Sequence, residues 1–105
     1  MCSSDLTIPP PPTIADGIRI TTPGALTFPV LKANVNDVVL VSDDEVREAV
    51  RFLALRAHVV TEPTGAVAAA AVLSRRLPLP AGARVGVVLS GGNVDPDVLG
   101  DILRG

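Results

Sequence analysis

The clearest structural signal in this sequence is the segment Val85-Gly86-Val87-Val88-Leu89-Ser90-Gly91-Gly92-Asn93-Val94-Asp95. An apolar run without polar alternation is typical of a strand buried on both faces, as in a parallel sheet. Ligands of open α/β sheets bind beyond the carboxyl ends of the strands, which is where residues 90–93 would lie. The glycines allow close backbone approach, and Ser90 and Asn93 offer short hydrogen-bonding groups. The segment therefore predicts a ligand-binding loop after a buried strand and leaves the ligand open.

Strand and helix signals alternate along the rest of the chain. Strands are predicted at residues 38–41, 58–61 and 84–89. Helices are predicted from Pro29, from Ser42, from Thr64 to about Leu77, and over residues 97–103. Alternation of this kind favours parallel α/β layering, and 105 residues form at most one domain.

The helix after Ser42 has the strongest local signal. Ser42 and Glu45 have the spacing of a capping box, in which each side chain bonds the other residue's backbone N–H. The helical spacing predicts one buried stripe, made of Val46, Ala49, Val50, Leu53 and Ala57.

Composition excludes several classes of protein. The net charge is −2 and Arg75-Arg76 is the one basic cluster, which argues against nucleic-acid binding. The longest apolar stretch, residues 66–73, is far shorter than the ~20 residues of a membrane span. Without a signal-peptide pattern, a cytoplasmic protein is expected. Cys2 is the only cysteine, so an internal disulfide or thiolate metal cage is excluded.

Three ordered motifs resemble one enzyme family. They are Thr13-Ile14-Ala15-Asp16-Gly17 with the following Pro23-Gly24-Ala25-Leu26-Thr27-Phe28-Pro29, Glu62-Pro63-Thr64-Gly65-Ala66-Val67, and Ser90-Gly91-Gly92-Asn93-Val94-Asp95. Together they are similar to the threonine dehydratase and serine racemase group of fold-type II, tryptophan synthase beta-like enzymes that use pyridoxal 5'-phosphate (PLP). The resemblance implies an α/β fold in which residues 13–105 form the C-terminal part of the PLP-binding large domain. Its parallel strands alternate with helices, and its sheet would be incomplete in this chain.

Residues 1–12 do not match the family. Residues 1–6 resemble the peptide that a translated sequencing adapter would give, although a natural N-terminus is the alternative. Residues 7–12 form a proline-rich lead-in.

The resemblance implies roles for five residues in PLP binding. Ser90 would donate a hydrogen bond to the pyridine nitrogen, and a neutral partner there moderates the electron sink in a way that suits β-elimination. Gly91 and Asn93 would form the adjoining wall, and Asn93 could also bind an effector. Glu62 would lie beside the cofactor, where it could hold or relay a proton, and Gly17 would pass close to the ring face.

Each role has a structural alternative. Ser90 could cap a strand or turn, and Glu62 could interact with the N-terminus of the following helix. The glycines of the loop, Gly92 above all, could serve a plain turn, and Asp16 is a common turn former. His58, the only histidine, is interpreted as the polar start of a strand.

The lysine that holds PLP as a Schiff base has no counterpart here. Lys32 is the only lysine, and it falls where the family pattern places none. The family lysine, the asparagine after it, the phosphate-cradling glycines and the metal-binding carboxylates all precede Thr13. We therefore expect neither a catalytic residue nor a metal ligand in this chain.

The resemblance implies a homo-oligomeric whole enzyme that converts L-threonine or L-serine to a 2-oxo acid and ammonia. A serine racemase or another fold-type II amino-acid lyase is the alternative within the family. A non-catalytic α/β ligand-binding or regulatory module is the alternative from another class.

Overall fold

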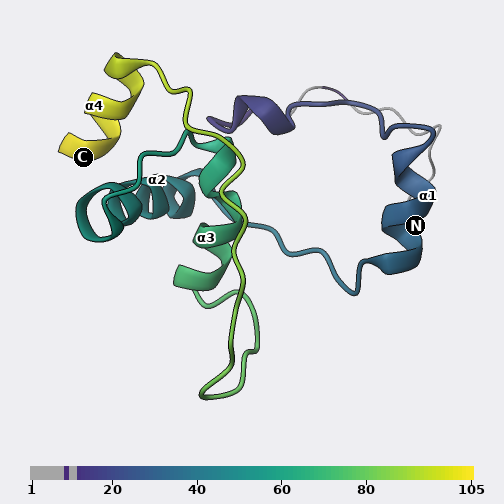
Figure 1. The fold of residues 1–105 in the computed structure, drawn as a ribbon. Coiled ribbons are helices and arrows are strands. Elements are labelled where there is room, and N and C mark those ends of the chain that lie inside the picture. Colours follow the sequence, from purple (N-terminus) through teal and green to yellow (C-terminus); the bar gives the residue numbers. More distant parts are fainter. Residues whose placement is uncertain (1–8, 10–11) are drawn as a thin grey trace.

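The computed structural model describes residue 9 and residues 12–105. Of the expected non-family segment 1–12, residues 1–8 and 10–11 thus lie outside the described residues. In chain order the elements are η1 (Asp16–Ile18), α1 (Thr27–Asn34), α2 (Asp43–Phe52), η2 (Leu53–Ala57), η3 (Thr64–Ala66), α3 (Val67–Leu73) and α4 (Pro96–Arg104) (Figure 1). No helix in the described ranges is both long and apolar enough to cross a membrane.

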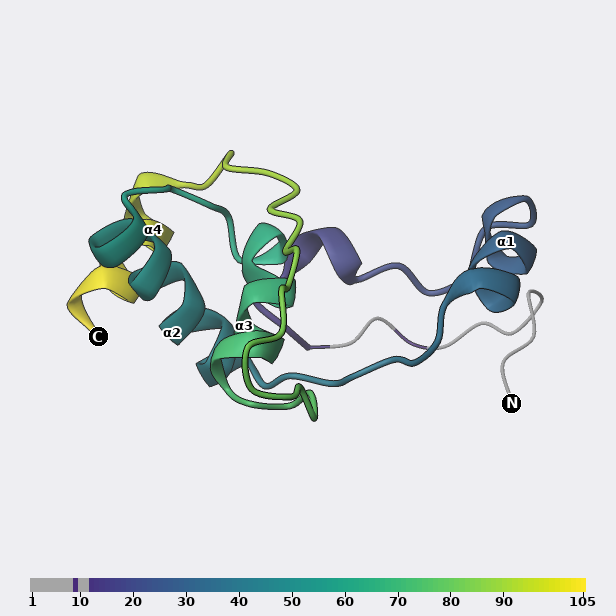
Figure 2. The same ribbon diagram turned by 60° about the horizontal axis from the view of Figure 1, so that its bottom comes forward.

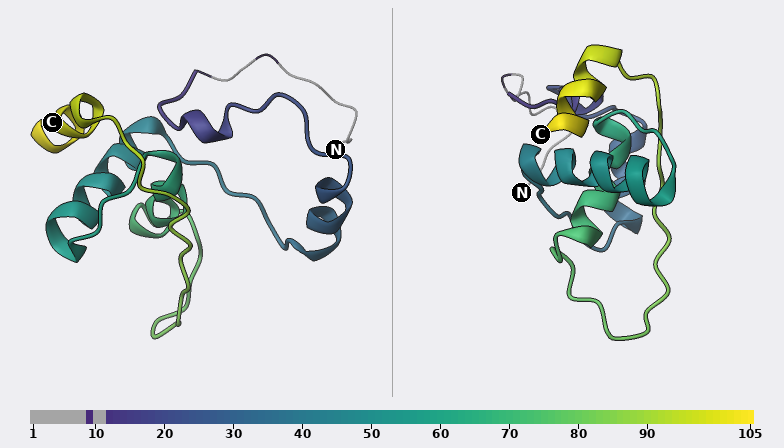
Figure 3. Two further views of the ribbon diagram at one scale, coloured as in Figure 1. Left: turned by 45° about the horizontal axis from the view of Figure 1, so that its top comes forward. Right: turned by 90° about the vertical axis from the view of Figure 1, so that its left-hand side faces the viewer.

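Helices α2, α3 and α4 form a packed body, and α1 stands apart from it (Figures 1 and 2). After α3 the chain makes a long excursion away from the body before it returns alongside the 59–62 segment and enters α4 (Figure 3). The candidate site described below lies where this returning segment meets residues 13–17 and the turn before α3.

The expected capping box of α2 is confirmed. The Glu45 N–H donates to Ser42 Oγ at 3.1 Å, and the Ser42 N–H donates to Glu45 Oε1 at 2.8 Å. Four residues of the predicted stripe are buried as expected, namely Val46, Ala49, Val50 and Leu53. The prediction was wrong for Ala57, which is exposed because α2 relaxes into a π-helical turn that ends at His58.

Small side chains let α2 and α3 approach closely. The core joins the buried stripe of α2 to Ala66, Ala69 and Ala70, with Ile102 of α4 completing it. These alanines are buried in a cluster made of helical residues. Arg51 of α2 fixes α4, because its Nε and Nη2 donate to the Ile102 carbonyl oxygen at 3.1 and 2.9 Å. That carbonyl lies in the last turn of α4, where helix carbonyls lack partners within the helix.

The expected parallel strands are not confirmed, because the described residues contain no β-strand. His58 does not begin a strand, since its φ of 60° is left-handed and the next N–H, of Val59, donates to the Leu53 carbonyl. Residues 38–41 and 84–89 form no ladder of hydrogen bonds with a neighbouring strand. Leu40 in the first segment is 83% exposed, and Val88 in the second is 76% exposed. A parallel strand requires a hydrogen-bonded neighbour, and the described part of the chain supplies none to these segments. Each segment is covered on one side only, where Val41 and Val87 pack against the helical core.

Three helix boundaries also differ from expectation. The helix expected from Pro29 is α1, which begins at Thr27. The helix expected to run to Leu77 ends at Leu73, because Arg75 adopts a left-handed φ of 58°. The last helix begins at Pro96, with Asp95 as N-cap: its Oδ1 accepts the Asp97 N–H at 2.8 Å. Proline suits the first helical position because its missing N–H needs no partner there.

Candidate functional site

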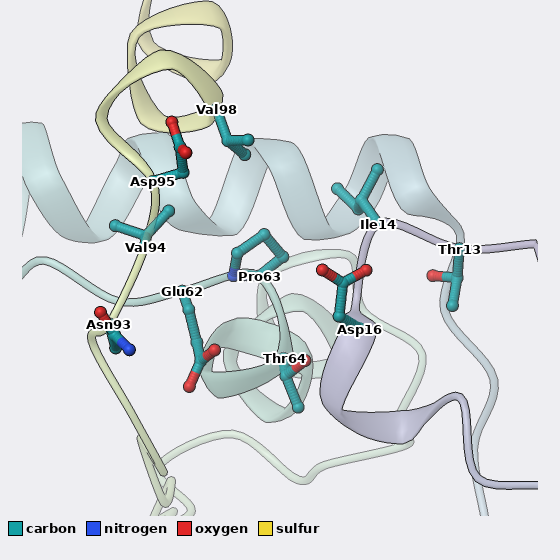
Figure 4. Close-up of a pocket in the computed structure, with 10 residues that line it drawn as sticks. All are labelled: Thr13, Ile14, Asp16, Glu62, Pro63, Thr64, Asn93, Val94, Asp95 and Val98. Atoms are coloured by element: carbon teal, nitrogen blue, oxygen red, sulfur yellow. The ribbon is translucent and has the colours of Figure 1, made fainter.

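A pocket of about 360 Å³ lies where three separate segments meet (Figure 4). Its lining comes from the N-terminal segment, the turn before α3 and the start of α4. The lining residues are Thr13, Ile14, Asp16, Glu62, Pro63, Thr64, Asn93, Val94, Asp95 and Val98.

The N-terminal segment is fixed onto the start of α2. Thr13 Oγ1 donates to Asp43 Oδ1 at 2.6 Å, and the Ile14 N–H donates to Asp43 Oδ2 at 3.3 Å. The Ala15 N–H in turn donates to Thr13 Oγ1 at 3.2 Å, and Ala15 itself is buried. One carboxylate therefore holds this wall of the pocket.

A second hydrogen bond joins this wall to the turn before α3. The Gly17 N–H donates to Thr64 Oγ1 at 2.8 Å, across 47 residues of sequence. A Cβ on Gly17 would lie 2.8 Å from Thr64 Cγ2, closer than packed carbon atoms approach. Glycine is therefore required here by space rather than by backbone angle.

The predicted glycine-rich loop packs directly on the Glu62 turn. The Glu62 N–H donates to the Gly91 carbonyl oxygen at 3.1 Å. A Cβ on Gly91 would overlap Glu62 Oε1, and one on Gly92 would lie 2.8 Å from the Val60 carbonyl oxygen. Gly65, which follows Glu62 in the turn, also approaches the loop closely, because a Cβ on Gly65 would lie 2.5 Å from the Gly91 carbonyl oxygen.

The structure brings most of the predicted site residues together. Glu62 and Asn93 line the pocket, with the Glu62 carboxylate between Asn93 and Thr64 in Figure 4. Gly91 lies against Glu62, and Gly17 bonds Thr64. Ser90 lies outside the pocket lining; its side chain is exposed and makes no hydrogen bond within the described part of the chain.

Lys32 is not part of this arrangement. It lies in the last turn of α1, the helix that stands apart from the body (Figures 1 and 2). His58 is likewise absent from the pocket lining.

Sequence reasoning missed the polar ties around the pocket. Thr64 belongs to a quoted motif, yet nothing local shows that its hydroxyl bonds Gly17. Asp43 lies in the first turn of the helix predicted after Ser42, and nothing local shows that its carboxylate binds Thr13 and Ile14. In both cases the partner is 29 or more residues away in sequence, beyond the reach of a spacing argument.

The pocket is lined by carboxylates and carries no lysine or arginine among its lining residues. Its acidic members are Asp16, Glu62 and Asp95. Among the described residues, no group of three or more histidine, cysteine, aspartate or glutamate side chains could hold a metal ion.

Among the described residues, the carboxylate with a strongly lowered pKa, Glu45, lies away from the pocket. Arg76 donates from Nε and Nη2 to the two carboxylate oxygens of Glu45, both at 2.9 Å. These bonds lower the Glu45 pKa from its ordinary 4.5 to about 2, with help from the Ser42 backbone N–H. The pair joins α2 to the loop after α3, so its role is structural.

Two curated proteins align with most of this chain. It is 45% identical over 84 residues to the catabolic L-threonine dehydratase of Escherichia coli K12, covering 79% of this chain and 26% of that protein. It is 40% identical over 95 residues to the serine racemase of Dictyostelium discoideum, covering 90% and 30% respectively. The chain thus spans less than a third of the length of these relatives.

A solved structure shares the arrangement of the chain. The T.th. threonine deaminase superposes with a TM-score of 0.77 at 42% identity, covering 86% of this chain and 32% of that one. The family model described as "Pyridoxal-phosphate dependent enzyme" matches residues 2–91, so the match extends into the segment 1–12 that we expected to lie outside the family. Since the match covers well over half of the chain, this protein belongs to the pyridoxal-phosphate-dependent enzyme family.

Proposed function

We propose that this chain is the C-terminal part of a PLP-dependent ammonia-lyase acting on L-threonine or L-serine. In this proposal it supplies the wall of the cofactor site that faces the pyridine nitrogen. The observation that carries it is the packing of Gly91 against Glu62, next to a Ser90 hydroxyl with no protein partner in the described chain.

The residues present suit an aromatic cofactor with a nitrogen acceptor. Gly17 and Gly91 pack tightly against Thr64 and Glu62, so a Cβ at either position would displace a side chain of the Glu62 turn. An exposed serine hydroxyl is a suitable neutral donor to a ring nitrogen.

PLP, when bound, supplies an electron sink that stabilises the negative charge left when the C–H bond at the substrate's α-carbon breaks. Ser90 would hold the ring nitrogen by a hydrogen bond without adding a charge, and so would leave the sink moderate. Glu62, at the pocket, could accept or return a proton. Gly17 and the 90–93 loop would orient the ring and exclude water from its edges.

The nucleophilic lysine would come from the remaining part of the enzyme. Lys32 is poorly placed for this role, because α1 packs on none of α2, α3 and α4. The exposed apolar segments at residues 38–41 and 85–89 would pair with strands of that remaining part, completing the sheet that the described chain lacks.

A serine racemase is the second candidate, because one of the relatives carries that name at similar identity. The two reactions can be separated once the complete reading frame is expressed. L-Serine converted mainly to D-serine favours the racemase, and L-serine converted mainly to a 2-oxo acid favours the lyase. A non-catalytic module would give neither product.

A hybrid enzyme tests whether this chain completes a PLP site. The matched segment of the Escherichia coli relative is replaced by the corresponding residues of this chain, and the result is called the hybrid enzyme below. We expect the hybrid enzyme to show the absorbance of bound PLP and to release a 2-oxo acid from L-threonine. A soluble, folded hybrid enzyme that binds no PLP would refute the proposed function.

A further inference from the structure

We propose that Thr64 is a positioning residue, which fixes the backbone of Gly17 at the edge of the PLP site. This inference rests on the proposed function, because Gly17 matters to the reaction only if PLP lies against it. Thr64 itself need not touch the cofactor.

Thr64 and Gly17 sit in two short helical turns that meet beside the pocket. Thr64 begins η3 directly after Glu62 and Pro63, and Gly17 is the middle residue of η1. Their hydrogen bond, 2.8 Å between Gly17 N and Thr64 Oγ1, ties the two turns together. Figure 4 shows Thr64 and Asp16, the neighbour of Gly17, facing the same space.

The turn that holds Gly17 is short. η1 is three residues long, has no side-chain cap and buries none of its residues. Asp43 holds the residues before this turn, Thr13 and Ile14, whereas the bond from Thr64 reaches the Gly17 backbone itself. The Thr64 bond is thus a direct tie between this turn and the segment that carries Glu62.

Both the hydroxyl and the methyl group of Thr64 help to fix the position of Gly17. Its Oγ1 accepts the Gly17 N–H, and its methyl group occupies the space that a Cβ on residue 17 would need. Valine keeps the branched shape and removes the acceptor, whereas serine keeps the acceptor and removes the methyl group. These two variants therefore separate the hydrogen bond from the packing.

Thr61 provides a matched control three residues earlier. Its side chain is 1% exposed, and its hydroxyl has no hydrogen-bond partner among the described residues. Thr61→Val is the same chemical change in the same segment, but it removes no bond. An effect that is specific to Thr64→Val cannot then be attributed to threonine loss in general.

The experiment measures amide hydrogen exchange at Gly17 and the dissociation constant for PLP in the hybrid enzyme and its variants. Losing one hydrogen bond predicts exchange at Gly17 that is about fivefold faster in Thr64→Val, and PLP binding that is about fivefold weaker. Thr64→Ser should restore both values to within about twofold, and Thr61→Val should leave both unchanged.

Three results would overturn the inference: unchanged exchange in Thr64→Val, faster exchange with unchanged PLP affinity, or no rescue by Thr64→Ser. A hybrid enzyme that binds no PLP before any Thr64 change would instead refute the proposed function. In that case the exchange rate at Gly17 would still decide whether Thr64 holds this backbone.

Discussion

Replacing Gly65 by alanine should separate the loop of residues 90–93 from the turn before α3. The backbone at Gly65 has an ordinary negative φ, so alanine is conformationally allowed there and would by itself favour a helical turn. The obstacle is space, since the new Cβ would lie 2.5 Å from the Gly91 carbonyl oxygen and 3.0 Å from the Gly91 nitrogen. Relieving that overlap requires the Gly91 peptide to retreat by about 0.5–1 Å.

The cost has two parts. Overpacking of a tight contact costs about 1–3 kcal/mol. The retreat also stretches the bond from the Glu62 N–H to the Gly91 carbonyl oxygen, worth about 1 kcal/mol. Together we expect the free energy of unfolding to fall by about 2–4 kcal/mol, and the apparent unfolding midpoint of the hybrid enzyme by at least about 4 °C.

Gly100→Ala is the matched control, because the atom nearest to the Cβ that it would add is the tip of the exposed Arg104 side chain, at 3.3 Å. Thermal unfolding at one scan rate, with PLP absorbance recorded in parallel, compares the two variants. Gly100→Ala should keep the bound cofactor and leave the midpoint unchanged or slightly higher, since alanine favours a helix. If Gly65→Ala unfolds at the same temperature as Gly100→Ala, or higher, the close approach of Gly65 to the loop is not real and the packing argument fails.

Three other perturbations have expected outcomes. Ser90→Ala should leave the unfolding midpoint of the hybrid enzyme unchanged but slow turnover, because the activation barrier rises by about 2–4 kcal/mol. Ser90→Asp should shift the PLP absorbance and the product ratio. If both variants keep the parent's rates and spectra, Ser90 has no role in binding the cofactor. The lowered pKa of Glu45 predicts stability that is fully present above about pH 4.5 and is lost as the pH falls toward 2, so Glu45→Gln should flatten the pH dependence of the midpoint between those values. His58→Gly should raise the midpoint, because glycine removes about 1 kcal/mol of left-handed strain at φ 60°; a lower midpoint would mean that the imidazole makes a stabilising contact.

Local signals in the sequence predicted the helices well. The capping box at Ser42 and the stripe of α2 depend on residues three or four apart, which is the range over which helix geometry is determined. The proline at the start of α4 and the acidic cap before it are local in the same sense. Such elements form from nearby residues whatever the rest of the molecule does.

The strands could not be predicted as reliably, because a strand exists only with its neighbours. The run at residues 84–89 has the composition of a buried parallel strand, yet the described chain gives it no ladder. Of the candidate site, the sequence motifs named Glu62 and Asn93, and both residues line the pocket. The ties through Asp43 and Thr64 were not, since their partners are far apart in sequence.

The uncovered apolar segments also bear on how a cell would handle this chain. Leu40 and Val88 are exposed and lie in β-prone stretches that pair with no other strand in the described structure. Unpaired edges of this kind recruit other strands, from the correct partner or from any chain nearby. Made without its partner segments, the chain should therefore collect in inclusion bodies or be held by chaperones and degraded by proteases. Under the proposed function, its half-life after synthesis should lengthen sharply when the rest of the proposed enzyme is supplied in the same cell, as a pulse-chase experiment would show.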